Sequence, residues 1–416
     1  MDGVVYAQHF RHSYISYIDA SPPDVKKIVL ASVTKSCELD PLPTSIVKQH
    51  IDALSPLLAR IINASLTTVF PAPTKHAVVV PILKSDAKAL TNYRPISNIT
   101  FVAKTTEHFM EENRIYGIYQ SAYRAHHSVE TALVRIHNDI ADSIDNRQNV
   151  LLVLLDLSVA FDTIDHTILL RRLSGYGLSG DVLAWLTSYL YDRTYVVRVK
   201  SGVSEADIIT IGVPQGTVLG PLLFNAYIAP LTTLLQKHTI RHHLYADDTQ
   251  LYITFPPTDH TQALTHMEAC VQDAKAWLCY NGLVMNDNKS QAIVIHSSSL
   301  RTPTSLTRVN ICGQLVETSP IIRDLGFNVD ANLTMTSQVA NVCRSAYYHL
   351  SRIAKIRDSI STTVCKSLIH GLVTSRLDYG NAILYGISDR HMHRLEMVQR
   401  SAAQLSGKFG GATGSP

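Results

Sequence analysis

Residues 242–253 read His-His-Leu-Tyr-Ala-Asp-Asp-Thr-Gln-Leu-Tyr-Ile, two apolar and aromatic runs separated by a pair of carboxylates. This pattern predicts a β-hairpin over residues 243–255 with Asp247 and Asp248 at its tip. Acid pairs are common in hairpin turns, so this pair alone is a weak signal. The flanking side chains indicate that the turn is anchored in a core rather than projecting into solvent.

A third acid, Asp156, lies 91 positions earlier and directly follows the apolar run Val150–Leu155. A run that is apolar throughout predicts a strand buried on both faces. A carboxylate at its end is unfavourable unless a cation or hydrogen bonds compensate the charge. Helix N-capping explains Asp156 as well as metal binding does when the residue is considered alone. Asp162 and Asp165 are more typical of acids in the first turn of a helix.

The order of the surrounding elements predicts that these acids meet. The predicted order fits an α+β fold. It runs from a helix over 128–145 through a strand, two helices, the hairpin and a further helix to a strand near 292–295. The sheet would be mixed or antiparallel, with helices on one face, and would bring Asp156 next to Asp247. Carboxylates suit Mg²⁺, and two Mg²⁺ ions about 3.5–4 Å apart stabilise the attacking and leaving oxygens of a phosphoryl transfer. The three acids therefore predict a two-metal site of the kind that nucleotide polymerases use.

Two further segments carry groups that suit a nucleotide. The loop Gly212–Gly216 permits close backbone approach through its glycines, and Gln215 can both donate and accept hydrogen bonds. Lys84 and Arg94 follow short apolar runs and suit triphosphate oxygens. An ordinary strand-to-helix loop and two solvated basic side chains are the alternative interpretations.

The composition is that of a packed globular protein. The 416 residues are 46% hydrophobic and 17% charged, and the length allows two or three domains. The net charge is only +3, but residues 341–416 carry ten Lys and Arg against four Asp and Glu, a net of +6. A cationic C-terminal section suits a phosphate backbone held near metal-binding carboxylates. Ordinary solvated helix faces would give the same charge.

The cysteine spacing and the N-terminus bear on the cellular compartment. The six cysteines show no C-x₂-C pairing, which indicates reduced and mostly buried thiols with neither a disulfide framework nor a zinc site. We see no secretory signal and no membrane-spanning stretch. These features predict an intracellular protein of the nucleus, the cytoplasm or both.

Hydrophobic periodicity predicts the remaining elements. These are two or three helices over 24–70, a strand at Val78–Lys84, paired strands at Tyr195–Val199 and Ile208–Ile211, helices at Leu222–Leu235 and His260–Asn281, strands at Ala292–Ile295 and Ile321–Val329, and helices from Val339 to Leu405.

With these segments in place, the chain resembles the reverse transcriptase of a non-LTR, LINE-type retrotransposon, close to the jockey and chicken-repeat groups. The similarity covers about residues 25–405, and its ordered blocks are very specific. They are Tyr93–Ser97, Gln120–Arg124, Val153–Asp162, Gly212–Leu223, Leu244–Leu251 and Asn286–Lys289, with Ser375–Ala382 beyond them.

The resemblance implies a right-hand polymerase fold and an RNA-directed DNA polymerase. The implied parts are an N-terminal helical extension over 1–72, fingers over 73–149, a palm over 150–298 and a helical thumb over 299–416 with a disordered tail. The implied partners are an RNA template, a DNA primer and dNTPs. The implied cofactor is Mg²⁺, with Mn²⁺ as a substitute, and the primer 3′-hydroxyl would attack the α-phosphate of a dNTP.

The resemblance also assigns roles to individual residues. Phe161 would be the aromatic gate against a ribose 2′-hydroxyl, and Lys289 would protonate the leaving pyrophosphate. The full implied set is Asp156, Asp247 and Asp248 as catalytic and metal-binding carboxylates, Lys84, Arg94, Phe161, Gln215, Gly216 and Lys289 around the dNTP, and Gln120 and Arg124 at the template.

Departures from the family pattern keep two alternatives open. The stretch between Phe109 and Tyr119 is shorter than the family's fingers helix, and no endonuclease sequence precedes Met1, so we expect a chain without that domain. The first alternative is therefore a decayed fragment that keeps only RNA or hybrid binding. The second is a palm-type nucleotidyl cyclase, which Gln215-Gly216 and Arg94-Pro95 speak against.

Overall fold

The computed structural model describes residues 20–32, 42–83, 93–98, 119–124, 126–214, 216–217, 219–296 and 306–407, with only the backbone at 73, 82–83 and 93–98. The chain forms two compact units. Unit 1 comprises Met1–Gln120, Leu157–Thr233 and Lys275–Met285, and unit 2 comprises Ser121–Asp156, Leu234–Ala274 and Asn286–Pro416. Each unit therefore takes its residues from three separate segments of the chain.

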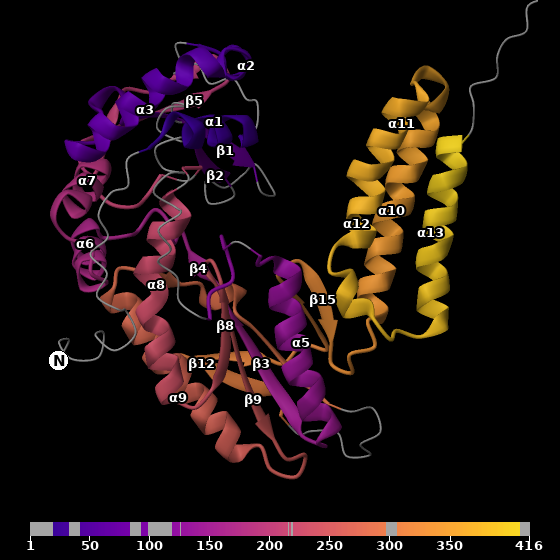
Figure 1. Cartoon of the computed structure of the whole chain (residues 1–416). Helices are drawn as coiled ribbons and strands as arrows, with labels where there is room; N and C mark the ends of the chain where they lie inside the picture. The colour runs from indigo at the N-terminus through magenta and orange to yellow at the C-terminus, as the bar shows by residue number, and fades with distance from the viewer. Residues whose placement is uncertain are drawn as a thin grey trace, which may run out of the picture. The chain divides into compact units, whose positions relative to one another are not determined.

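Unit 2 is built on a four-stranded sheet in the order β11-β3-β9-β8 (Figure 1). Its strands are β3 (Asn149–Leu155), β8 (Arg241–Tyr245), β9 (Asp248–Phe255) and β11 (Gln291–Ile295). All three strand pairings are antiparallel. The sheet, predicted as mixed or antiparallel, is thus antiparallel. Among the described strands, β1 (His76–Leu83) and β5 (Arg193–Val199) of unit 1 pair in parallel.

The helix α5 (Val129–Asp145) covers one face of this sheet (Figure 1). Ser128 begins the helix, because its side chain accepts a hydrogen bond from the Thr131 N–H and closes a capping box. Ile136 and Ile140 pack against Leu152 and other residues of the sheet. Residues of β3 that point to both faces are buried, as its apolar sequence predicts.

Two hairpins and a helical bundle complete unit 2. The hairpins are β12–β13 (Arg308–Ile311 and Gln314–Glu317) and β14–β15 (Ile321–Asp324 and Phe327–Asp330). The expected strand Ile321–Val329 is therefore wrong as one strand, because the chain turns at Leu325 and Gly326, both at positive φ. The bundle consists of α10 (Thr336–Ile356), α11 (Thr362–Ile369), α12 (Ser375–Asp378) and α13 (Asp389–Gly407).

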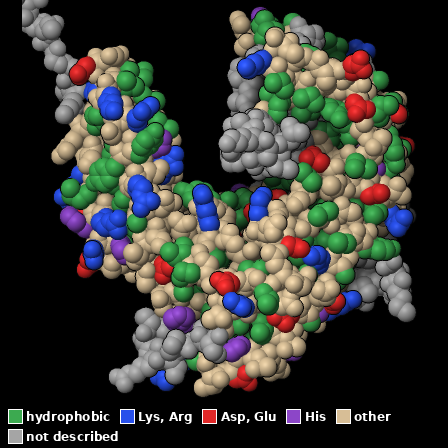
Figure 2. Space-filling view, turned by 180° about the vertical axis from the view of Figure 1, so that it is seen from behind, with side chains coloured by type: hydrophobic (Ala, Val, Ile, Leu, Met, Phe, Trp, Pro, Cys, Tyr) green, Lys and Arg blue, Asp and Glu red, His purple; other side chains and the backbone are tan. Residues whose placement is uncertain are grey.

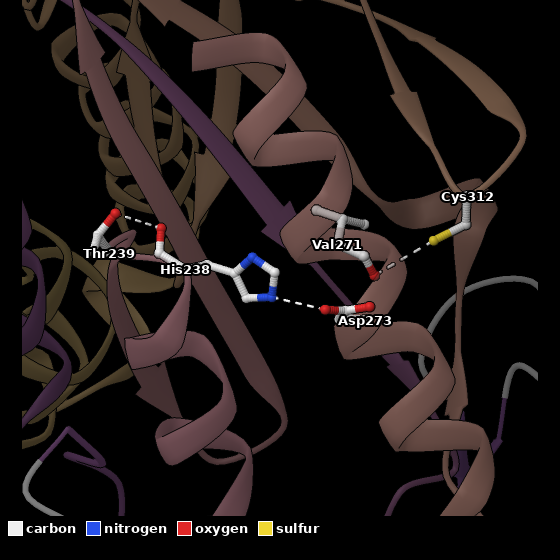
Figure 3. A network of polar contacts seen from close by, with 5 residues as sticks. All are labelled: His238, Thr239, Val271, Asp273 and Cys312. Atoms are coloured by element: carbon white, nitrogen blue, oxygen red, sulfur yellow. Dashed lines mark hydrogen bonds and ion pairs between the residues drawn. The ribbon is translucent and has the colours of Figure 1, made fainter. Parts of the chain in front are cut away.

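The end of α8 and the β12–β13 hairpin both contact α9 (Thr261–Tyr280) through polar side chains (Figure 3). Nε2 of His238 lies 2.9 Å from Oδ2 of Asp273. The Cys312 thiol, between β12 and β13, donates to the Val271 carbonyl at 3.5 Å. These groups therefore make hydrogen bonds and an ion pair. Cys312 is one of five free cysteines that the structure describes.

Unit 1 contains a second sheet and several helices. Its strand order is β2-β1-β5-β6, with β7 also paired to β5. Phe70 packs edge-on against Trp185 and Tyr189, at 5.4 and 5.1 Å between ring centroids, which joins the N-terminal helices to α7. The elements are α1 (Pro22–Ala31), α2 (Thr44–Gln49), α3 (Ile51–Thr67), β1 (His76–Leu83), β2 (Tyr93–Asn98), β4 (Leu157–Ser158), α6 (His166–Gly175), α7 (Gly180–Leu190), β5 (Arg193–Val199), β6 (Gly202–Val203), β7 (Asp207–Ile209), α8 (Leu219–Lys237, ending in unit 2) and β10 (Val284–Met285).

The predicted helices over 24–70 and the paired strands near 195–211 are confirmed. Asp165 caps α6 by accepting from the Ile168 N–H at 2.9 Å, in line with its expected helix role. Within the described part of the chain, no helix is both long and apolar enough to cross a bilayer.

Candidate active site

The β8–β9 hairpin carries two of the predicted acids. Tyr245 pairs with Asp248, so the turn consists of Ala246 and Asp247. Ala246 has φ of +55°, a conformation that two-residue hairpin turns require and that glycine adopts with less strain. The hydrophobic strands hold this turn in one geometry, which fixes where the two carboxylates leave the backbone.

The third acid reaches the hairpin through strand register. Leu155 of β3 pairs with Thr249 of β9, so Asp156 leaves β3 at the level of Asp248. The main-chain carbonyl of Asp156 accepts from the Asn286 N–H at 2.8 Å. The strand order β3-β9-β8 therefore brings together two segments that are 91 residues apart in the sequence.

Electrostatic interactions couple these carboxylates. Burial, and after it the charges of Asp247, Asp156 and Asp324, together raise the pKa of Asp248 to about 7. Oδ2 of Asp156 is buried and has no hydrogen-bond partner among the described residues. Nζ of Lys289 lies 3.7 Å from this oxygen, so a cation already stands beside it.

These observations fit a divalent cation. The three carboxylates are half-buried. Carboxylates that repel one another are stabilised by a positive charge between them, and the donor atoms are the hard oxygens that Mg²⁺ prefers. Among the described residues, no three acidic, histidine or cysteine side chains are already arranged around one point as a metal cluster. Mg²⁺ commonly uses one or two carboxylates and takes its other ligands from water and substrate phosphates.

Phe161 and the loop at Gly212 lie against each other in unit 1. The Gly212 N–H donates to the Ile164 carbonyl at 2.7 Å, and the Val213 N–H donates to the Phe161 carbonyl at 2.8 Å. The Phe161 ring stacks on Phe224 with 4.6 Å between ring centroids. The predicted gate residue and the predicted nucleotide loop are thus neighbours in the fold.

A cavity of about 430 Å³ opens beside this loop in unit 1. It is mainly apolar, with Tyr195 and Ile209 on one side and Asp162 and Pro214 among its other lining residues. A pocket of this size could hold a small organic group.

The structure describes only some of the other predicted site residues. Gln120 is buried at 4% exposure, and Arg124 is half-buried. Gly216 is exposed at φ +97°. Lys84 and Gln215, like the stretch between Phe109 and Tyr119, lie outside the described residues, and Arg94 is described by its backbone in β2 alone.

Sequence reasoning missed Asp324. This residue ends β14, is 3% exposed, and its Oδ1 accepts a hydrogen bond from Nε2 of Gln250 at 3.1 Å. Burial raises the pKa of Asp324 to about 6, and the bond from Gln250 opposes the rise. The sequence gives no clear signal for this residue, because Asp324 directly follows Arg323 and resembles an ordinary surface acid.

His243, on β8, predicts how stability depends on pH. It is 1% exposed, and its ring nitrogens have no hydrogen-bond partner among the described residues. The pKa of His243 falls from 6.5 to about 4, mainly through burial and also through the positive charges of Arg135, His242 and His127, while Asp139 opposes the fall.

The unfolded chain therefore binds a proton between pH 6.5 and 4 that the folded chain does not bind. Through this group, the free energy of unfolding falls by about 3 kcal/mol from above pH 6.5 toward pH 4. The raised pKa values of Asp248 and Asp324 act in the opposite direction, so we take the His243 contribution as the difference in slope between wild type and His243→Gln, measured by urea unfolding at pH 4.5 to 7.5. An equal slope in this variant would assign the pH dependence to other groups.

The chain was compared with known proteins. The sequence profile described as "Reverse transcriptase (RNA-dependent DNA polymerase)" matches residues 82–329, more than half of the chain. The chain belongs to the reverse transcriptase family. This membership confirms the predicted right-hand polymerase fold, and the matched range contains the β8–β9 hairpin and Asp156.

Relatives of this chain include proteins of mobile elements. It is 26% identical to "Probable RNA-directed DNA polymerase from transposon BS" of Drosophila melanogaster over 83% of the chain and 40% of the relative. It is 23% identical to "RNA-directed DNA polymerase from mobile element jockey" of the same species over 84% of the chain and 40% of the relative. The resemblance to LINE-type reverse transcriptases is thus confirmed, and the chain spans about 40% of the length of these relatives.

Among solved structures, the chain is similar to "Structure of apo telomerase from Candida Tropicalis truncated from C-terminal domain". The TM-score is 0.41 at 13% identity, over 70% of this chain and 59% of the other.

Proposed function

We propose that this chain is an RNA-directed DNA polymerase that extends a DNA primer on an RNA template with dNTPs. The observation that carries the proposal is the convergence of Asp156, Asp247 and Asp248 at one end of an antiparallel sheet. Membership of the reverse transcriptase family supports the same activity.

In this proposal the three carboxylates hold divalent cations, which supply charge stabilisation at the attacking and leaving oxygens. The strained turn at Ala246 orients Asp247, and β3 orients Asp156. Lys289, whose ammonium lies 3.7 Å from Asp156, is within reach to neutralise or protonate the pyrophosphate that leaves.

The remaining sites and parts follow the family resemblance. Residues 1–72 form a helical extension, 73–149 the fingers, 150–298 the palm and 299–416 the thumb. We assign dNTP contacts to Lys84, Arg94, Phe161, Gln215 and Gly216 and template contacts to Gln120 and Arg124. The hydrogen bonds between the Phe161 turn and the Gly212 loop support a shared nucleotide site.

A second candidate function is RNA or hybrid binding without synthesis. The surface of the α10–α13 bundle carries many Lys and Arg side chains (Figure 2). A hollow of about 490 Å³ between α10 and α13 is lined by Arg344, Tyr347, His393 and Arg394, among others. Cations beside an aromatic ring suit a nucleic-acid backbone and base.

A primer-extension assay distinguishes these functions. The purified chain is incubated with an RNA template, an annealed DNA primer, dNTPs and Mg²⁺ or Mn²⁺. We expect extension that requires the template and stops when EDTA removes the cation. Salt-sensitive RNA binding without extension would favour the binding remnant, and a cyclic product from nucleoside triphosphates alone would favour the cyclase.

A further inference from the structure

We propose that Asp324 is a positioning residue, which holds the catalytic turn through Gln250 and couples that turn to the C-terminal helical bundle. The expected effect on catalysis rests on the proposed polymerase function. The contacts that link Asp324 to the turn and to the bundle all lie within unit 2. Nothing in the sequence pattern assigns a role to Asp324 or to the side chain of Gln250.

The Gln250–Asp324 pair is buried on both sides. Gln250 is 1% exposed and lies two residues after Asp248 on β9, and its Nε2 is 3.1 Å from Oδ1 of Asp324. A buried hydrogen bond to a carboxylate is stronger than one between neutral groups. If either partner alone is removed, the other is left buried without its bond, which is unfavourable.

Further contacts hold β14 against the same part of the sheet. Gln250 and Gln291 both pair with Leu154, one from each side of β3. Oε1 of Gln291 accepts a long hydrogen bond from the Arg323 N–H at 3.4 Å. Consecutive residues of β14 thus bond to glutamines one step from the end of β3, where Asp156 leaves the sheet.

The opposite strand of the hairpin is fixed to the bundle. Phe327, at the start of β15, is fully buried in the hydrophobic cluster that contains Val339 and Ile383. The Asn328 N–H donates to Oε1 of Gln338 at 3.0 Å, and the Tyr379 hydroxyl donates to the Leu325 carbonyl.

The β14–β15 hairpin therefore has one strand on the sheet and the other on the bundle. A displacement of the bundle reaches Asp248 through Asp324 and Gln250. A phosphoryl-transfer site loses rate when its carboxylates move by about 1 Å, so the pair ties catalytic geometry to the position of the helices.

The test uses the full chain and four variants. Asp324→Leu removes the acceptor. Asp324→Asn keeps an acceptor oxygen at the same place. The double variant Gln250→Leu/Asp324→Leu removes both polar partners, so no buried group is left unsatisfied and the fold is retained. Asp330→Ala is the matched control, because Asp330 bonds to the Thr334 N–H at 2.9 Å at the far end of the same hairpin.

We expect amide hydrogen exchange in residues 244–252 to rise about tenfold in Asp324→Leu and in the double variant, and to stay unchanged in Asp324→Asn and Asp330→Ala. The corresponding kcat should fall about tenfold, while the KM for dNTP stays within about twofold. The double variant should regain thermal stability relative to Asp324→Leu without regaining kcat, which a purely structural role does not predict.

Unchanged exchange in the double variant, or an equal rise in Asp330→Ala, would overturn the proposal. Recovery of kcat together with stability in the double variant would also overturn it. If the wild-type chain extends no primer, the proposed function fails, and the exchange measurement still decides whether Asp324 holds the turn.

Discussion

Asp247→Asn lowers template-directed nucleotide incorporation by roughly 10³-fold or more, the loss typical of removing a group that acts in the transition state. Asparagine has nearly the same shape as aspartate but lacks its negative charge. The change removes one of the three negatively charged ligands of the proposed site, so the site attracts a divalent cation more weakly. This loss outweighs the easier ionisation of Asp248, whose pKa falls when the neighbouring charge is removed. Single-turnover primer extension with Mg²⁺ measures the loss.

The control for this prediction is Asp145→Asn at the exposed end of α5, which should extend primers at the wild-type rate. The free energy of unfolding of both variants, measured in urea, should stay within about 0.5 kcal/mol of the wild-type value. Equal extension by Asp247→Asn and wild type would show that this carboxylate takes no part in the reaction.

Gly212→Ala destabilises the protein by about 3 kcal/mol or more, through overpacking and backbone strain. A Cβ at Gly212 would stand 2.7 Å from the carbonyl oxygen of Asp162 and 2.8 Å from its Cα. These atoms belong to the backbone, so they cannot rotate away as a side chain would. Gly212 also has φ of +83°, which L residues rarely adopt.

Gly177→Ala is the matched control for steric contact. Gly177 lies in the same unit at φ +95°, and an added Cβ there meets nothing within 4 Å. Its substitution should therefore lower the free energy of unfolding only by the cost of placing alanine at positive φ, about 1–2 kcal/mol. Urea unfolding of both variants separates the two effects, and equal losses would mean that the loop at Gly212 moves away from Asp162 without strain.

The parts of the fold that the sequence predicts are those with strong local patterns. The apolar run of β3 and the periodic faces of α5 and α9 determine their elements directly, because burial requires that spacing. The meeting of Asp156 with the β8–β9 hairpin was predictable because both acids follow apolar strands, and one sheet can bring the ends of two non-consecutive strands together.

The parts that the sequence does not predict depend on tertiary contacts. The split of residues 321–329 into two strands follows from the turn at Leu325–Gly326. Gly326 is a turn signal, but the leucine beside it, which is also at positive φ, is not. The Gln250–Asp324 hydrogen bond joins residues 74 positions apart, and the local sequence around neither residue indicates this pairing. The antiparallel order of the main sheet likewise depends on long-range pairing that single-strand patterns leave open.

The interleaving of the two units has a consequence for synthesis on the ribosome. Unit 1 includes Lys275–Met285, and unit 2 combines Ser121–Asp156 with segments that begin at Leu234. Neither unit can therefore complete its fold while the middle of the chain is still being made. At about 5–20 residues per second, the helices before residue 120 wait roughly 10–30 s for their last partners. During that interval the nascent polypeptide exposes apolar surface, so its yield in cells should depend on chaperones that bind emerging chains.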